Sequence, residues 1–144
     1  MRTALIIGAS GGIGRSISSA LAARGVSVTG LSRDADGLDV TDADSVDRVM
    51  ARQTGPYDLI LIATGILAPA GEEPEKSLSR IKAAAMAEVM AANAIGPALI
   101  LRHVPRLLPR HARSVAAVLT ARVGSIGDNF LGGWYSYRAS KAAA

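Results

Sequence analysis

The sequence predicts an α/β domain with a parallel β-sheet, and three observations lead to this prediction. Short apolar runs alternate along the chain with stretches of helical periodicity, as expected of parallel strands joined by helices. The composition is 49% hydrophobic but only 3% aromatic, so Ala, Val, Leu and Ile must build the core. Strands buried on both faces use these residues. The length of 144 residues predicts a single domain over residues 1–144.

The first apolar run, Thr3–Ile7, leads directly into a glycine-rich turn, Gly8–Gly14. An apolar stripe follows at helical spacing, formed by Ile17, Ala20 and Leu21. A strand, a glycine turn and a helix in this order present free backbone N–H groups to a phosphate. The glycines follow the pattern G-x-x-x-G-x-G. The alternative is a tight strand-to-helix turn that binds no ligand.

The second apolar run, Ser27–Leu31, ends beside Arg33. In a dinucleotide-binding fold the residue just past the second strand meets the adenosine ribose. An acid there binds the 2′-hydroxyl of NAD, whereas an arginine pairs with the 2′-phosphate of NADP. Arg33, together with Arg15 in the glycine turn, therefore favours NADP(H). The alternative is that either arginine is a surface residue.

Further strands and helices are predicted downstream. The strands are Leu38–Val40, Leu59–Ala63 and Ser114–Leu119, and the helices cover residues 43–53 and 76–108, with an interruption at Gly96-Pro97. Together these elements predict a Rossmann-like, doubly wound parallel sheet of five strands in the order 3-2-1-4-5.

Two of these strands end in residues suited to a nucleotide. Asp39, at the end of the third strand, can accept a hydrogen bond from the adenine amino group or cap the next helix, although Asp42 is better placed as a cap. Ala63 and Gly65 follow the fourth strand, and their small size lets a ribose lie close.

Tyr137 and Lys141 are four residues apart, so on a helix they share one face. An ammonium beside a phenol stabilises the phenolate, which makes Tyr137 usable as an acid or base near neutral pH. The pair gains its significance from its place, just after the fifth strand of a dinucleotide fold.

Composition excludes several classes. The chain has no cysteine, so disulfides and thiolate metal sites are excluded, in keeping with a reducing cytoplasm, and we expect no metal. No apolar run approaches the roughly 18 residues of a membrane span, and the N-terminus does not resemble a signal peptide. We therefore expect a cytoplasmic protein without membrane contact.

The net charge of +4 rests on thirteen arginines against three lysines. Four of the arginines are spaced by three or four residues: Arg102, Arg106, Arg110 and Arg113. No aromatic residues interleave to stack on bases, so we interpret this group as a solvated helix end and expect no nucleic-acid partner.

Taken together, the motifs resemble those of the short-chain dehydrogenase/reductase family, and most closely the branch of C-factor and sniffer-type carbonyl reductases. The matching segments run through the whole chain in the family's order: Gly8–Gly14, Leu38–Val40, Ala63–Gly65, Asn93–Pro97, Arg122–Ile126 and Gly132–Lys141.

The resemblance implies roles by position. Tyr137 would donate a proton to a carbonyl as hydride arrives from the nicotinamide of NADP(H), and Lys141 would hold the ribose hydroxyls. Asn93 would hold a water that links Lys141 to solvent. The phosphates would be lined by residues of the glycine turn, namely Gly8, Ser10, Gly12, Ile13 and Gly14.

Two departures from the family pattern stand out. The family's active serine falls at Ala121, leaving Thr120 and Ser125 as the nearest hydroxyls, and we take Ser125 as the catalytic candidate. The chain also ends three residues past Lys141, where the family continues with further strands and the substrate lid. This predicts a C-terminally truncated domain.

The leading interpretation is an NADP(H)-dependent enzyme that reduces a small carbonyl compound to an alcohol. The alternatives are a cofactor-binding signalling protein with little turnover and an inactive fragment. An exposed fifth strand and the apolar helix before it would drive association, so we also expect a homo-oligomer.

Overall fold

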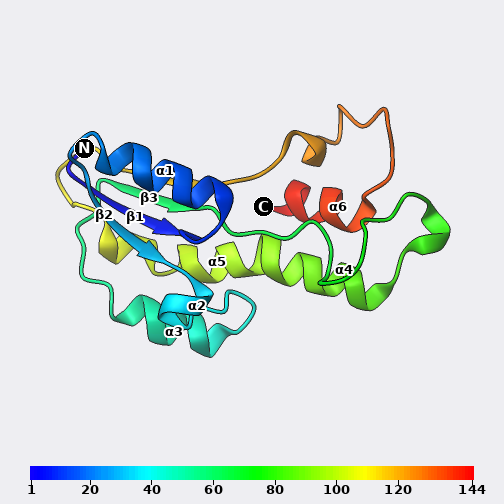
Figure 1. Cartoon of the computed structure of the whole chain (residues 1–144), viewed down its shortest axis with the longest axis horizontal. Helices are drawn as coiled ribbons and strands as arrows, with labels where there is room; N and C mark the ends of the chain where they lie inside the picture. The colour runs from blue at the N-terminus through cyan, green and yellow to red at the C-terminus, as the bar shows by residue number, and fades with distance from the viewer.

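Four parallel strands form the sheet of the computed structural model, which describes residues 1–144 (Figure 1). They are β1 (Thr3–Ile7), β2 (Ser27–Leu31), β3 (Leu59–Ile62) and β4 (Val115–Val118). Their order is β2-β1-β3-β4, and all three pairings are parallel. The parallel α/β class predicted from the sequence is therefore confirmed, as is the relative order of these four strands.

The prediction of a fifth strand at Leu38–Val40 was wrong. The chain after β2 forms a short helix, α2 (Arg33–Asp36), whose first turn is capped by the side chain of Ser32. The Asp39 N–H then donates to Ser45 Oγ at 3.0 Å. Because side chains satisfy this backbone and α2 redirects the chain, the segment does not pair with β2. Leu38 still contributes to the core, where it is buried.

Helices cover both faces of the sheet (Figure 1). α1 (Gly12–Ala22) lies on one face, where its Ile17 and Leu21 pack against Ile6. On the other face, α3 (Ala43–Ala51) and α5 (Gly96–Leu101) pack against alternate residues of the same strands. Strand residues that alternate between two buried faces explain the continuous apolar runs in the sequence.

One long helical segment runs along this second face and extends beyond the sheet. It consists of α4 (Ala83–Met90), a π-helical turn (Ala91–Ile95) and α5. The sequence predicted an interruption of the helix at Gly96-Pro97. The structure instead has the wider π-helical turn just before these residues, and Pro97 lies in the first turn of α5. Pro97 has no N–H to donate, and the π-turn accommodates the missing bond without ending the helix.

By length and composition, the stretch Ala83–Leu101 passes the test for a membrane-spanning helix, with a mean hydropathy of 1.6. The expectation that no segment would do so was wrong, because the alanines between its larger apolar residues keep the mean hydropathy high. A core helix passes the same test. A third of this stretch is buried in the fold, including Val89 and Ile100.

The last helix, α6 (Tyr135–Ala143), packs against α4 at the end of the molecule toward which β1 points (Figure 1). Three 3₁₀ turns complete the described elements, at Leu78–Arg80, Val104–Leu107 and Arg122–Gly124. The C-terminal ends of the strands, α4 and α6 thus surround one region, and this region holds the candidate site.

Candidate cofactor-binding and catalytic site

The glycine turn is built so that two stretches of backbone can touch. Gly8 has φ of 87°, and a Cβ on Gly14 would lie 2.2 Å from the Gly8 oxygen, so neither position accepts a side chain. α1 begins at Gly12 without a side-chain cap or an acidic residue in its first turn. Its first N–H groups therefore remain available to an anion, which is the arrangement that binds phosphate.

A cavity of about 510 Å³ opens at the C-terminal ends of β1, β2 and β3. Six of the ten predicted cofactor residues line it: Gly8, Ser10, Arg33, Asp39, Ala63 and Gly65. The other four, Gly12, Ile13, Gly14 and Arg15, lie in the first turn of α1 beside it. Thr64 also lines the cavity, and its buried hydroxyl has no hydrogen-bond partner. The structure thus brings the predicted nucleotide residues together.

The two arginines expected at the 2′-phosphate differ in their surroundings. Arg33, the first residue of α2, is exposed and lines the cavity. The Arg15 guanidinium donates to the Ser10 carbonyl at 3.0 Å and is not among the lining residues. Only Arg33 therefore faces the cavity.

Asp39 uses one carboxylate oxygen locally. Its Oδ1 accepts hydrogen bonds from the Thr41 N–H at 2.9 Å and from the Thr41 hydroxyl at 2.7 Å. These bonds hold the pKa of Asp39 below its ordinary value. The predicted alternative role as helix cap is taken by Asp42, whose side chain accepts from the Asp44 N–H. Asp39 thus lines the cavity as a carboxylate fixed by Thr41.

Asn93 sits in the π-helical turn, fully buried, and ties three segments together. Its Oδ1 accepts from the Ile66 N–H at 2.8 Å, and its Nδ2 donates to the Ile66 carbonyl at 2.8 Å. The same Nδ2 donates to Ser140 Oγ at 2.9 Å. π-turns within helices recur at functional sites, and this one places an amide between the β3 loop and α6.

Lys141 reaches the same point from α6. A Cβ placed on Gly65 would lie 3.1 Å from both Asn93 Oδ1 and Lys141 Nζ, so the absence of a side chain there leaves room for both groups. The ammonium donates to the Leu119 carbonyl at 2.9 Å, just past β4. Lys141 is only 7% exposed, and its burial lowers its pKa.

Tyr137 lies one turn before Lys141 on α6 and is half-buried. Lys141 Nζ is 5.9 Å from the centre of its ring, and Trp134 packs edge-on against that ring with the centroids 6.2 Å apart. The predicted shared helix face of Tyr137 and Lys141 is therefore present. The ring of Tyr137 thus has both the Lys141 ammonium and the Trp134 ring as neighbours.

The serine candidate is less tightly placed. Ser125 follows the 3₁₀ turn Arg122–Gly124 and is exposed. This turn lies against α6, because a Cβ on Gly124 would come within 2.8 Å of the Lys141 carbonyl oxygen. Thr120 is exposed as well. Ser125 thus follows a turn that lies against α6, and Ser125 itself is exposed.

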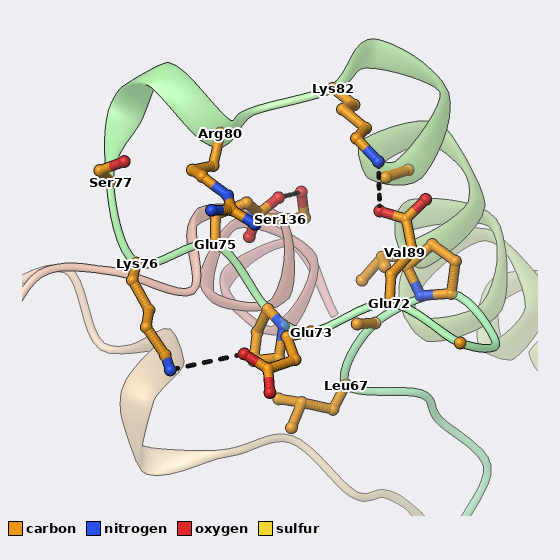
Figure 2. A pocket seen from close by; sticks show the side chains of 15 residues that line it. Leu67, Glu72, Glu73, Glu75, Lys76, Ser77, Arg80, Lys82, Val89 and Ser136 are labelled. Carbon is orange, nitrogen blue, oxygen red and sulfur yellow. Dashed lines mark hydrogen bonds and ion pairs between the residues drawn. The ribbon is translucent and has the colours of Figure 1, made fainter.

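A second cavity, of about 500 Å³, lies between the loop after β3, α4 and the start of α6 (Figure 2). Charged side chains surround it, among them Glu72, Lys76, Arg80 and Lys82. Glu75 is buried at its edge and bonds to Ser136.

The sequence interpretation missed both Glu75 and Ser140. Their contacts join residues 61 and 47 positions apart, so no local motif marks them.

Known proteins resemble this chain in sequence and in fold. Residues 4–108 match the family described as the NAD dependent epimerase/dehydratase family. A curated relative, the 1-hydroxy-2-glutathionyl-2-methyl-3-butene dehydrogenase of Rhodococcus sp. (strain AD45), is 35% identical over 159 aligned positions. That alignment covers 100% of this chain and 67% of the relative.

Solved structures show the same fold. A crystal structure from Burkholderia multivorans, described as a short-chain dehydrogenase/reductase with bound NADP, superimposes with a TM-score of 0.85 at 25% identity, over 99% of this chain and 68% of that one. A carbonyl reductase from Pseudomonas aeruginosa PAO1 gives a TM-score of 0.81 at 24% identity, over 99% and 72%. The chain belongs to the family of short-chain dehydrogenases/reductases and NAD-dependent epimerases/dehydratases.

Proposed function

We propose that this chain binds NADP(H) and carries the hydride-transfer site of an oxidoreductase that interconverts a carbonyl and an alcohol. The observation that carries the proposal is the meeting of Asn93, Ser140 and Lys141 at Gly65, the end of the glycine-lined cavity, with Tyr137 one turn away.

The residues present fit a dinucleotide. The uncapped first turn of α1 would hold the phosphates, and Ala63 and Gly65 leave room for a ribose. The unpartnered hydroxyl of Thr64 has a donor and an acceptor to offer a ligand in the cavity. Arg33 favours a 2′-phosphate and hence NADP(H) over NAD(H). The Burkholderia multivorans structure, crystallised with NADP, supports the same choice.

Bound NADP(H) would supply the hydride, and the chain's own residues would handle the proton. In the reductive direction, Tyr137 donates its phenolic proton to the carbonyl oxygen as that oxygen gains charge. Lys141 places a positive charge beside the phenolate that results. Asn93 fixes the loop after β3 against α6 and so keeps Lys141 beside Gly65. In the oxidative direction the phenolate accepts the alcohol proton.

A second candidate concerns the substrate. The Rhodococcus relative is named for a glutathionyl alcohol, and here a cavity lined by both acidic and basic side chains adjoins the start of α6. Glutathione carries carboxylates and an ammonium, which such a lining complements. The proposal is an alcohol or carbonyl compound bearing a glutathionyl group. Comparing turnover of a glutathionyl alcohol with that of the same alcohol without the tripeptide tests it.

Ala121 favours a different outcome, a cofactor-binding protein with little turnover, because one hydrogen bond that would orient the substrate is missing. Titrating the chain with NADPH and then with NADH, followed by cofactor fluorescence, separates both of these possibilities from an inactive fragment. Carbonyl-dependent consumption of NADPH then separates the oxidoreductase from the signalling protein. A nucleotide-binding oxidoreductase or signalling protein binds NADPH more tightly than NADH. An inactive fragment binds neither, and that result would overturn the cofactor proposal.

A further inference from the structure

The helix that carries Tyr137 lacks a cap of its own. α6 begins after Trp134, which has φ of 54° and makes no side-chain hydrogen bond to the helix. No acidic residue stands in its first turn. The first N–H groups of a helix need acceptors from elsewhere, and the positive end of the helix dipole favours a carboxylate.

Glu75 supplies these acceptors from the loop after β3. Its Oε1 accepts from the Ser136 hydroxyl, and its Oε2 accepts from the Ser136 N–H at 3.3 Å. Its backbone oxygen accepts from the Trp134 N–H at 2.5 Å. Figure 2 shows the Glu75 and Ser136 side chains pointing toward each other across the edge of the cavity. One residue therefore accepts hydrogen bonds from both Trp134 and Ser136 at the start of α6.

This arrangement needs the carboxylate in its charged form. Glu75 is only 8% exposed, and burial, the largest single influence, raises its pKa, but the hydrogen bonds from Ser136 and from the backbone of Glu75 together leave the pKa below its ordinary value. The neighbouring acids are engaged differently. Glu73 pairs with Lys76 at 3.4 Å and Glu72 with Lys82 at 2.9 Å, both at the surface.

We propose that Glu75 caps α6 from outside the helix and thereby positions Tyr137 for proton transfer. Glu75 is a positioning residue, because it contacts the residue next to Tyr137 rather than the reacting atoms. Its effect on turnover rests on the proposed function, while its effect on α6 does not. A displacement of about 1 Å at a reacting group can reduce the rate about 100-fold. A small shift of α6 after loss of the cap would therefore lower the catalytic rate.

The experiment compares Glu75→Ala, Glu75→Gln and the control Glu73→Ala, which removes an exposed carboxylate from the same loop. The first readout is amide hydrogen exchange over residues 135–143, with residues 12–22 of α1 as the internal reference. The second is the emission of Trp134, the only tryptophan in the chain, which donates to Glu75 and packs on Tyr137.

Glu75→Ala should speed exchange over α6 about tenfold or more, because the carboxylate bonds to Ser136 are lost, leave α1 unchanged, and shift the Trp134 emission. Glu75→Gln keeps an acceptor and should fall between Glu75→Ala and the parent chain. Glu73→Ala should match the parent. Unchanged exchange over α6 in Glu75→Ala would overturn the proposal, whether or not the chain turns over substrate.

The third readout separates positioning from folding. It is the kcat of NADPH-dependent carbonyl reduction, calculated from the concentration of NADPH-binding sites rather than of total protein. That concentration is measured by titration with NADPH. Glu75→Ala should lower this kcat about tenfold to 100-fold while the NADPH Kd stays constant. If the total rate of Glu75→Ala falls only as much as its number of NADPH-binding sites, the role of Glu75 is merely structural, and the positioning proposal is contradicted. A parent chain that binds no NADPH contradicts the proposed function instead, and the exchange readout then decides the capping proposal alone.

Discussion

The amide of Asn93 donates a hydrogen bond of 2.9 Å to the hydroxyl of Ser140, which itself donates to the Tyr137 carbonyl at 2.8 Å. This chain of bonds connects the π-turn of the long helix to the backbone of α6 at a fully buried point. It couples the loop that lines the cofactor cavity to the helix that carries Tyr137 and Lys141.

Asn93→Ala should therefore destabilise the fold. The substitution leaves both backbone groups of Ile66 without partners and removes the donor to the Ser140 oxygen, and each buried group left unsatisfied costs about 1–3 kcal/mol. Urea unfolding followed by Trp134 fluorescence measures the loss. Asn129→Ala, which alters an exposed asparagine, is the control and should unfold like the parent. Equal urea midpoints for Asn93→Ala and the parent would show that the buried Asn93 amide does not stabilise the contact between the loop after β3 and α6.

Arg33→Ala should weaken NADPH binding about tenfold or more and leave NADH binding almost unchanged, since a charge-assisted hydrogen bond is worth about 1.5–3 kcal/mol. Arg15→Ala should have the smaller effect, because its guanidinium is held by the Ser10 carbonyl. Fluorescence titration of both cofactors gives the comparison, with the exposed Arg24→Ala as control. An equal loss for the two cofactors would contradict the assignment of Arg33 to the 2′-phosphate.

Lys141 predicts a dependence of stability on pH. Burial lowers its folded pKa below the ordinary value of 10.5, so in the window just below that value the unfolded chain binds more protons than the folded one. The free energy of unfolding therefore increases as pH rises through this window. Below the window, Lys141 is charged in both states, and burying the ammonium lowers the stability by its full amount. Lys141→Met should lack this increment, whereas Lys76→Met, at an exposed lysine, should keep it. Denaturant unfolding at several alkaline pH values measures the slopes, and identical slopes for Lys141→Met and the parent would contradict the account.

Ser125→Ala and Thr120→Ala test which hydroxyl takes the place of the serine that the family has at the position of Ala121. We expect Ser125→Ala to reduce kcat and Thr120→Ala to change it little, because the turn before Ser125 lies against α6, whereas Thr120 is exposed beyond the end of β4. Steady-state kinetics with a simple aromatic aldehyde measures both. A larger loss in Thr120→Ala would reverse the assignment.

Local patterns were enough to predict the parallel sheet, the order of its four strands and most of the cofactor cavity. Apolar runs and the Gly8–Gly14 turn are sequence features with direct structural meaning. The third strand failed because Ser32 caps α2 and Ser45 accepts the hydrogen bond of the Asp39 N–H. That competition between side chains and sheet pairing is not visible in the apolar pattern.

The candidate site was predictable where spacing along one helix defines it, as for Tyr137 and Lys141. Contacts between distant segments were not predictable. Glu75 reads as an ordinary charged loop residue, and only the folded chain brings it to Ser136. The roles of the site residues, association of the chain and its place in the cell remain predictions.

The most direct test of the account is the carbonyl-dependent consumption of NADPH by the parent chain and by Tyr137→Phe. The parent should consume NADPH with an aromatic aldehyde, and Tyr137→Phe should lose about 10²–10⁴-fold in kcat, the usual worth of a general acid. Its NADPH binding should persist, because the cavity residues from Gly8 to Asp39 are untouched. Tyr135→Phe, which removes the other hydroxyl of α6's tyrosines, should behave like the parent. Full activity in Tyr137→Phe, or no NADPH consumption by the parent chain, would contradict the central claim.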